Sequence, residues 1–100
     1  MNIISTTVTR RAEERNEHAL YHIDYTLSDG ALQRIVAAVH KPLTSLSAGE
    51  APVFIGNISC ENGQIYCSLP ESADIALLMA DFEGFVDEIK ADIAQENSAR

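Results

Sequence analysis

The last quarter of the chain carries apolar residues at the spacing of an amphipathic helix. From about Ser72 to Ala94 they recur every three or four positions, and most of the other positions are acidic or small. Ser72 is a favourable N-cap, and Asp74 lies near the positive end of the helix dipole. The pattern predicts one long helix with the apolar stripe Ile75, Leu78, Met79, Phe82, Phe85, Val86, Ile89 and Ile93.

The N-terminal part of the chain alternates instead with the period of two that is typical of β-strands. Ile4, Thr6 and Val8 alternate with polar residues and predict a first strand. Residues 10–17 are nearly all charged, which indicates a solvated hairpin end or an extension of an edge strand. A second strand is predicted from about Ala19 to Leu27, with one face formed by Tyr21, Ile23, Tyr25 and Leu27.

The tripeptide Ser28-Asp29-Gly30 predicts a hairpin loop of three residues, in which the glycine takes a positive φ and forms a bulge. In that register Leu27 lies opposite Ala31. Asp24 then lies opposite Arg34, and a pair of opposite charges across two strands is stabilising.

The segment that follows, residues 31–41, is compatible with two interpretations. Its loop chemistry and the Asp24–Arg34 pair favour a third strand. However, residues 40–42 resemble a helix stop, and a helix here would give the element order ββαββα within the same α+β class. The apolar residues at helical spacing are Leu32, Ile35, Val36 and Val39.

The clearest hairpin lies in the second half of the chain, after a loop predicted for residues 42–52. Asn62-Gly63 is the pair favoured in a type I′ turn, and it joins strands predicted at residues 53–60 and 64–69. A two-residue turn places Cys60 opposite Ile65 and Ile58 opposite Cys67. The apolar face of this hairpin comprises Ile58, Cys60, Ile65, Cys67 and Leu69, and the polar face comprises Asn57, Ser59, Tyr66 and Ser68.

These elements predict a single α+β domain over residues 1–100. It is an antiparallel β-meander of four to five strands with the long C-terminal helix packed on one face, which leaves the other face to water. Residues 95–100 are polar and are expected to form a frayed tail. The predicted core comprises Val8, Ile23, Tyr25, Ile35, Val39, Phe54, Ile58, Ile65, Leu69, Ile75, Leu78, Met79, Phe82, Phe85, Val86 and Ile89.

The charge of the chain restricts its partners. The formal net charge is −8, and residues 51–100 carry nine acidic and two basic residues. This excess argues against direct binding of nucleic acid or of an anionic membrane surface, and it permits a basic protein partner. No apolar run is long enough to span a bilayer, and residues 1–10 contain no apolar signal segment, so a cytoplasmic location is expected.

The candidate chemical groups give no catalytic motif. His18 and His22 lie four residues apart on a predicted strand, about 13 Å from each other and too far apart to share one metal ion. Cys60 and Cys67 lie on the predicted buried face with no basic residue nearby in sequence, which is typical of packed thiols. We therefore expect no enzyme activity, no catalytic residues, no cofactor and no metal site.

The sequence favours a small protein-interaction module that acts as an adaptor, an inhibitor or an assembly subunit. The alternatives are a module that binds a small ligand or a metal, an enzyme assembled between subunits, and a homo-oligomeric structural protein. Two surfaces are candidates for a protein partner. The first is an acidic helix face with Asp81, Asp87, Glu88 and Asp92, in a water-facing column that also includes Asp74 and Glu96. The second is a polar sheet face with Asn57, Ser59 and Tyr66.

Overall fold

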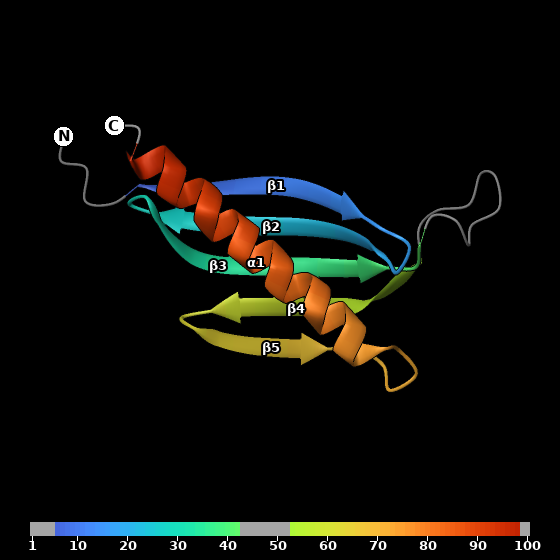
Figure 1. Ribbon diagram of the computed structural model, residues 1–100. Coiled ribbons are helices and arrows are strands. Elements are labelled where there is room, and N and C mark those ends of the chain that lie inside the picture. Colours follow the sequence, from blue (N-terminus) through green and yellow to red (C-terminus); the bar gives the residue numbers. More distant parts are fainter. Residues whose placement is uncertain (1–5, 43–52, 99–100) are drawn as a thin grey trace.

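A computed structural model of the chain describes residues 6–42 and 53–98. It contains one antiparallel sheet with the strand order β1-β2-β3-β4-β5 and one helix across it, as Figure 1 shows. The predicted α+β meander is confirmed, and the alternative helix over residues 31–41 is wrong because this segment is a strand. The elements are β1 Thr7–Arg15, β2 Leu20–Ser28, β3 Ala31–His40, β4 Phe54–Glu61, β5 Gln64–Ser68 and α1 Ile75–Ser98.

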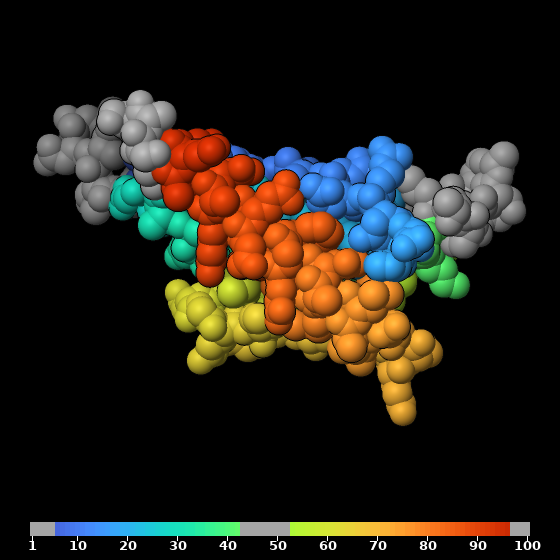
Figure 2. Space-filling view, viewed as in Figure 1, coloured from blue at the N-terminus to red at the C-terminus, as the bar shows by residue number. Residues whose placement is uncertain are grey.

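The helix crosses the sheet diagonally, from the C-terminal end of β5 to the beginning of β1 (Figure 1). Its apolar stripe covers the middle of the sheet, where Tyr21, Ile58 and Phe82 are completely buried. A diagonal helix leaves two corners of its sheet face uncovered. In Figure 2 the yellow β4–β5 hairpin emerges beside the helix at one of these corners. The buried cluster comprises Ala19, Tyr21, Ile23, Leu27, Ile35, Ala37, Val39, Ile58, Leu78, Phe82, Val86, Ile89 and Ile93.

The β2–β3 connection differs from the predicted three-residue loop. Asp29 and Gly30 have φ values of 52° and 84° and form a two-residue turn, because both tolerate the left-handed region. The Asp29 carboxylate accepts the N–H of Thr6 at 2.8 Å, which holds the turn against the start of β1. The bulge lies one step further along, between the Thr26 and Leu27 pairs.

The shorter turn and the bulge each shift the β2–β3 register by one residue, so beyond the bulge the register differs from the prediction by two. Arg34 lies opposite Thr26, and Asp24 lies opposite Val36. The predicted Asp24–Arg34 pair is therefore wrong. The Asp24 carboxylate instead pairs with Arg11 of β1 at 3.2 Å.

The β4–β5 hairpin has the predicted register, with Cys60 opposite Ile65 and Ile58 opposite Cys67. Asn62 and Gly63 form its turn with φ values of 55° and 78°. At its other end Gly56 is required for close packing, since a Cβ atom there would collide with the backbone oxygen of Ser68.

Four predicted core residues are exposed by 40–58% of their surface: Val8, Phe54, Ile65 and Ile75. Val8 and Ile65 lie on the two edge strands. Phe54 is displaced by a bulge, because β4 pairs Gly56 with Val39 and then Phe54 with His40. Cys67 is also exposed, against the prediction, and Cys60 is half-buried. The buried residues missing from the predicted core are Ala19, Leu20, Tyr21, Leu27, Ala37 and Ile93.

Both ends of α1 differ from the predicted limits. Asp74, and not Ser72, caps the helix, since its carboxylate accepts the N–H of Leu77 at 3.2 Å. The helix continues past Ala94 into the predicted tail and ends at Ser98. The Glu96 carboxylate accepts two hydrogen bonds from Arg10, at 2.8 and 2.9 Å, which anchors this last part of the helix to β1.

Candidate functional site

The most concentrated polar contact of the fold surrounds Asp81 on α1. Its Oδ2 atom accepts a hydrogen bond of 2.6 Å from the Tyr21 hydroxyl and one of 3.1 Å from the Asn16 amide. Nδ1 of His18 lies 3.3 Å from the same oxygen. Three donors from the β1–β2 turn and from β2 thus converge on one carboxylate of the helix.

The β1–β2 turn is shaped to present these donors. The side-chain oxygen of Asn16 accepts the backbone N–H groups of His18 and Ala19 at 2.8 and 3.0 Å. This arrangement closes the turn locally and leaves the Asn16 amide nitrogen free to reach Asp81. The short polar side chain therefore serves both the turn and the helix.

The electrostatics of this cluster are those of a structural contact. Partial burial raises the pKa of Asp81, but the hydrogen bonds from Tyr21, Asn16 and His18 outweigh it and hold the pKa below its usual value. Burial and the bond to Asp81 raise the pKa of Tyr21 above its usual value. Such a carboxylate is a weak base and such a phenol is a weak acid, so the pair is unsuited to proton transfer at neutral pH.

The acidic residues predicted to form one column on the helix lie on two flanks. Glu88 and Asp92 line a hollow on the side of β1 and β2, together with Glu14. Asp87 lines a different hollow, next to Ile65 of β5. Asp81 does not face water, since its side chain is only 18% exposed. The predicted single water-facing column is therefore wrong in geometry, although Asp87, Glu88 and Asp92 are individually exposed.

The sheet face opposite the helix gathers the other predicted residues. The β4–β5 register places Ser59 opposite Tyr66 and Asn57 opposite Ser68 on this open face. Tyr66 is 55% exposed, and its hydroxyl donates to the side chain of Gln64 at 2.8 Å. The three predicted residues of the polar sheet face, Asn57, Ser59 and Tyr66, are thus brought together.

A row of rings crosses the open face from β2 to β4. The ring centroids of His22 and His40 lie 4.9 Å apart, and those of His40 and Phe54 lie 5.6 Å apart. Phe54 is 58% exposed. The partly buried side chains of Val36 and Ala38 lie on the same face of β3. The C-terminal half of β3 and the beginning of β4 are therefore more apolar on this face than the sequence pattern predicts.

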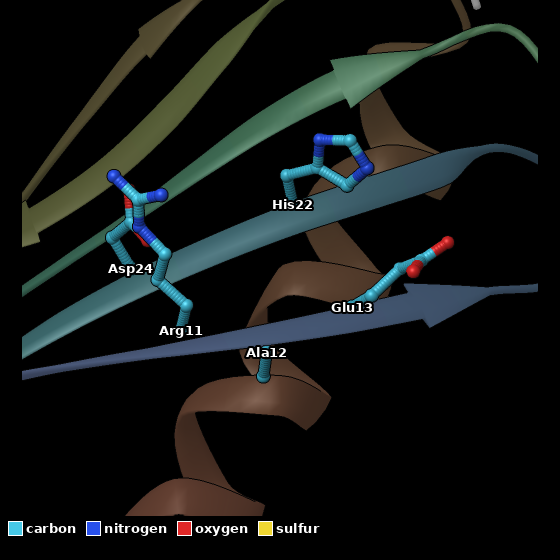
Figure 3. A pocket seen from close by; sticks show the side chains of 5 residues that line it. All are labelled: Arg11, Ala12, Glu13, His22 and Asp24. Carbon is cyan, nitrogen blue, oxygen red and sulfur yellow. The ribbon is translucent and has the colours of Figure 1, made fainter.

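Charged pairs border this apolar region. Arg11 and Asp24 form one pair, and Arg34 and Glu61 approach to 4.0 Å in another. Figure 3 shows the β1–β2 border, where Arg11 and Asp24 point toward each other and His22 and Glu13 stand beside them. The hollow they line has a volume of about 390 Å³ and is shallow and open to solvent.

The histidines do not assemble a metal centre in the part of the chain that the structure describes. His18 contacts Asp81 near the helix, whereas His22 and His40 lie on the open face. Across residues 6–42 and 53–98, no three His, Cys, Asp or Glu side chains are placed to hold a metal ion. Nδ1 of His40 is buried without a hydrogen-bond partner.

Sequence reasoning missed His40 and Phe54 on the open face, and Asn16, His18 and Tyr21 around Asp81. The alternation of β4 places Phe54 on the helix side, and only the bulge moves it to the open face. The Asp81 contacts join positions 60 or more residues apart. No local pattern signals contacts of that separation.

Comparisons with protein-family models, curated proteins and solved structures find no match to this chain. Within the described residues, no helix has both the length and the apolar character needed to cross a bilayer. Any statement on function therefore has to rest on the surfaces of the molecule.

Proposed function

We propose that this chain is a non-enzymatic protein-interaction module, and that a partner protein binds the open face of its sheet. The observation that carries this proposal is the row of rings formed by His22, His40 and Phe54 on this face, with Tyr66 separately on the same face of β5. Phe54 and Tyr66 each expose more than half of their surface, although both are large aromatic residues.

The arrangement matches the anatomy of protein interfaces. Aromatic residues are enriched at the centre of such interfaces, charged residues are depleted there, and the rim is polar. On the open face the rings of His40 and Phe54 and the side chains of Val36 and Ala38 lie on the middle strands β3 and β4, and Tyr66 lies on the edge strand β5. The pairs Arg11–Asp24 and Arg34–Glu61 border them.

The charge on this face favours a partner of mixed charge. The two border pairs contain one arginine and one carboxylate each, so the open face does not share the acidic excess of the chain. The basic partner that composition permits would instead contact the exposed acids of α1. The cytoplasmic location and the basic partner remain predictions from the sequence.

Site-specific photocrosslinking tests the proposal. A photoreactive phenylalanine derivative placed at Asn57 samples the open face, and the same group at Ala91 samples the outer surface of α1; both positions are exposed. We expect the Asn57 probe to yield a protein adduct, identified by mass spectrometry, and the Ala91 probe to yield much less. Binding is then measured with the purified partner.

The double variant Phe54→Ala/Tyr66→Ala should weaken that binding by about tenfold or more, as expected for large aromatic residues of an interface. Val8→Ala is the matched control, because Val8 is also an exposed apolar residue but lies on the helix side of β1. Equal adducts from both probes, an adduct with a second copy of the chain alone, or unchanged binding by the double variant would each contradict the proposal.

A further inference from the structure

The free edge of the sheet at β5 offers unpaired backbone groups. In a two-residue hairpin the residues that flank the turn, Glu61 and Gln64, form a hydrogen-bonded pair, and the pattern alternates from there. Ile65 and Cys67 therefore direct their N–H and C=O groups away from β4. No strand of the described residues pairs with this side of β5.

The residues of β5 do not protect this edge. Gln64–Ser68 contains no charge and no proline, and all five residues are exposed. The opposite edge strand, β1, carries five charged residues within Thr7–Arg15. Charged side chains on an edge strand discourage pairing with another chain, so β1 is protected and β5 is not.

Exposed apolar side chains lie at both ends of the β5 edge. Ile65, at its N-terminal end, is 47% exposed and stands beside the hollow lined by Val86, Asp87 and Lys90. Ile75, in the first turn of α1 beyond its C-terminal end, is 40% exposed. Figure 1 shows that the helix begins beside the end of β5, so both residues lie along the same margin.

We propose that a second copy of this chain binds here, through antiparallel pairing of β5 with β5 about a two-fold axis at Tyr66. Ile65 of one copy then pairs with Cys67 of the other through the outward backbone groups. The two Tyr66 residues face each other at the axis, and one ten-stranded sheet forms with both helices on the same side.

A second copy fits this edge because the edge is complementary to itself under that rotation. Antiparallel pairing brings the Ile65 end of one copy next to the Ile75 end of the other. Each exposed Ile65 therefore comes near the exposed Ile75 of the second copy. The same pairing also moves Lys90, beside Gly63 at one end, toward the Glu71 and Asp74 that follow the other end. Within the described residues no carboxylate forms an ion pair with Lys90.

This inference concerns the β5 edge, whereas the proposed function concerns the open face; the two surfaces share Tyr66, but His22, His40 and Phe54 lie away from the edge and stay accessible. The two open faces become continuous across the axis. A failure of dimerisation therefore leaves the open-face proposal standing, and a failure of the crosslinking test leaves the dimer standing.

Disulfide trapping tests the register directly. Directly opposed residues of a non-hydrogen-bonded pair have Cα atoms about 4.5 Å apart, within the range of about 4.4–6.8 Å that a disulfide spans. In a background with Cys60→Ala and Cys67→Ser, Tyr66→Cys should form a covalent dimer under mild oxidation. Thr9→Cys, exposed on the open face of the other edge strand, should remain monomeric.

Sedimentation equilibrium over a concentration series provides the second measurement. The wild-type chain should show a monomer–dimer equilibrium, and Ile65→Lys should raise the dissociation constant by about tenfold or more. Val8→Lys is the matched control, because Val8 is exposed to a similar extent on β1, and it should leave the constant unchanged. Circular dichroism verifies that both variants are folded.

A third variant separates edge pairing from loss of the fold. Cys67→Pro removes an N–H that points to the free edge, so it should abolish the dimer and preserve the β4–β5 hairpin. The proposal is overturned if the wild-type chain stays monomeric throughout the series. It is equally overturned if Thr9→Cys crosslinks as well as Tyr66→Cys, or if Val8→Lys weakens the dimer as much as Ile65→Lys.

Discussion

The two flanks of α1 are held to the sheet by different interactions. On the side of β1 and β2, Asp81 accepts hydrogen bonds from Tyr21, Asn16 and His18, and Glu96 accepts two from Arg10. On the side of β4 and β5, the described contacts are apolar. There Leu69 packs on the core, and within the sheet itself Gly56 permits the close approach of the Ser68 backbone.

This difference leaves the two sides of the molecule with different surfaces. Directional hydrogen bonds fix the position and tilt of the helix on the β1–β2 flank and use the polar groups there. The β4–β5 flank keeps an uncharged edge strand and an exposed Ile65. One helix is thus anchored along one side and leaves the other side of the same sheet open.

Replacing Asp81, whose carboxylate holds α1 to β2 and the β1–β2 turn, should have the largest effect on stability. Asp81→Ala leaves the buried Tyr21 hydroxyl and the Asn16 amide without their acceptor, and we expect a loss of about 2–3 kcal/mol in the free energy of unfolding. Asp87→Ala, on the other flank, should change it by less than about 0.5 kcal/mol. Urea denaturation measures both, and similar losses would refute the difference between the flanks.

The apolar flank should be most sensitive to added volume at Gly56. Gly56→Ala forces the backbone of Ser68 away from β4, and we expect a loss of about 1–3 kcal/mol in the free energy of unfolding. Gly84→Ala is the control, because a Cβ atom there meets nothing within 4 Å. The control should be neutral or slightly stabilising in the same urea titration, as alanine favours helix.

The element order and the β4–β5 flank follow closely from the sequence. Asn62-Gly63 alone determines the register of its hairpin, because a two-residue turn permits one pairing. The apolar spacing of the helix likewise identifies its buried stripe. These are local signals, and local signals are sufficient where a turn or a period defines the geometry.

The register of β2 and β3 and the exposure of Phe54 could not be derived in this way. Both depend on bulges, one beside Leu27 and one beside His40, and an extra residue in a strand leaves no trace in the hydrophobic pattern. The exposure of Ile65 and Val8 has another cause. It depends on the diagonal path of the helix, which is a property of the packed molecule.

For the acidic residues of α1, too, the sequence predicts only part of what the structure shows. Their helical spacing correctly predicts that Asp87, Glu88 and Asp92 are exposed. It does not predict that Asp81 meets Tyr21, because the contact requires the complete sheet to be in place. A partly buried carboxylate with three donors differs from a solvated one only in tertiary structure.

The pH dependence of stability should distinguish the anchored flank from the open one. Because the folded-state pKa of Asp81 is lowered, its stabilisation is present above the unfolded-state pKa of about 3.9 and is lost as the pH falls through the folded value. The advantage of the wild type over Asp81→Asn should therefore be greatest near neutral pH and shrink on acidification. Urea titrations from neutral to acidic pH measure it, and an advantage independent of pH would contradict the assignment.

The smallest effect is expected at the end of the anchored flank, where Arg10 binds Glu96. The two side chains are 37% and 48% exposed, so solvent weakens the pair although its geometry is good. Arg10→Ala should lower the free energy of unfolding only slightly and fray the last turn of α1 while leaving the Asp81 contacts intact. Amide hydrogen exchange should show faster exchange near Glu96 and unchanged exchange near Asp81. Faster exchange along the whole helix would instead show that the anchored flank acts as one cooperative unit, with Arg10 as one of its essential contacts.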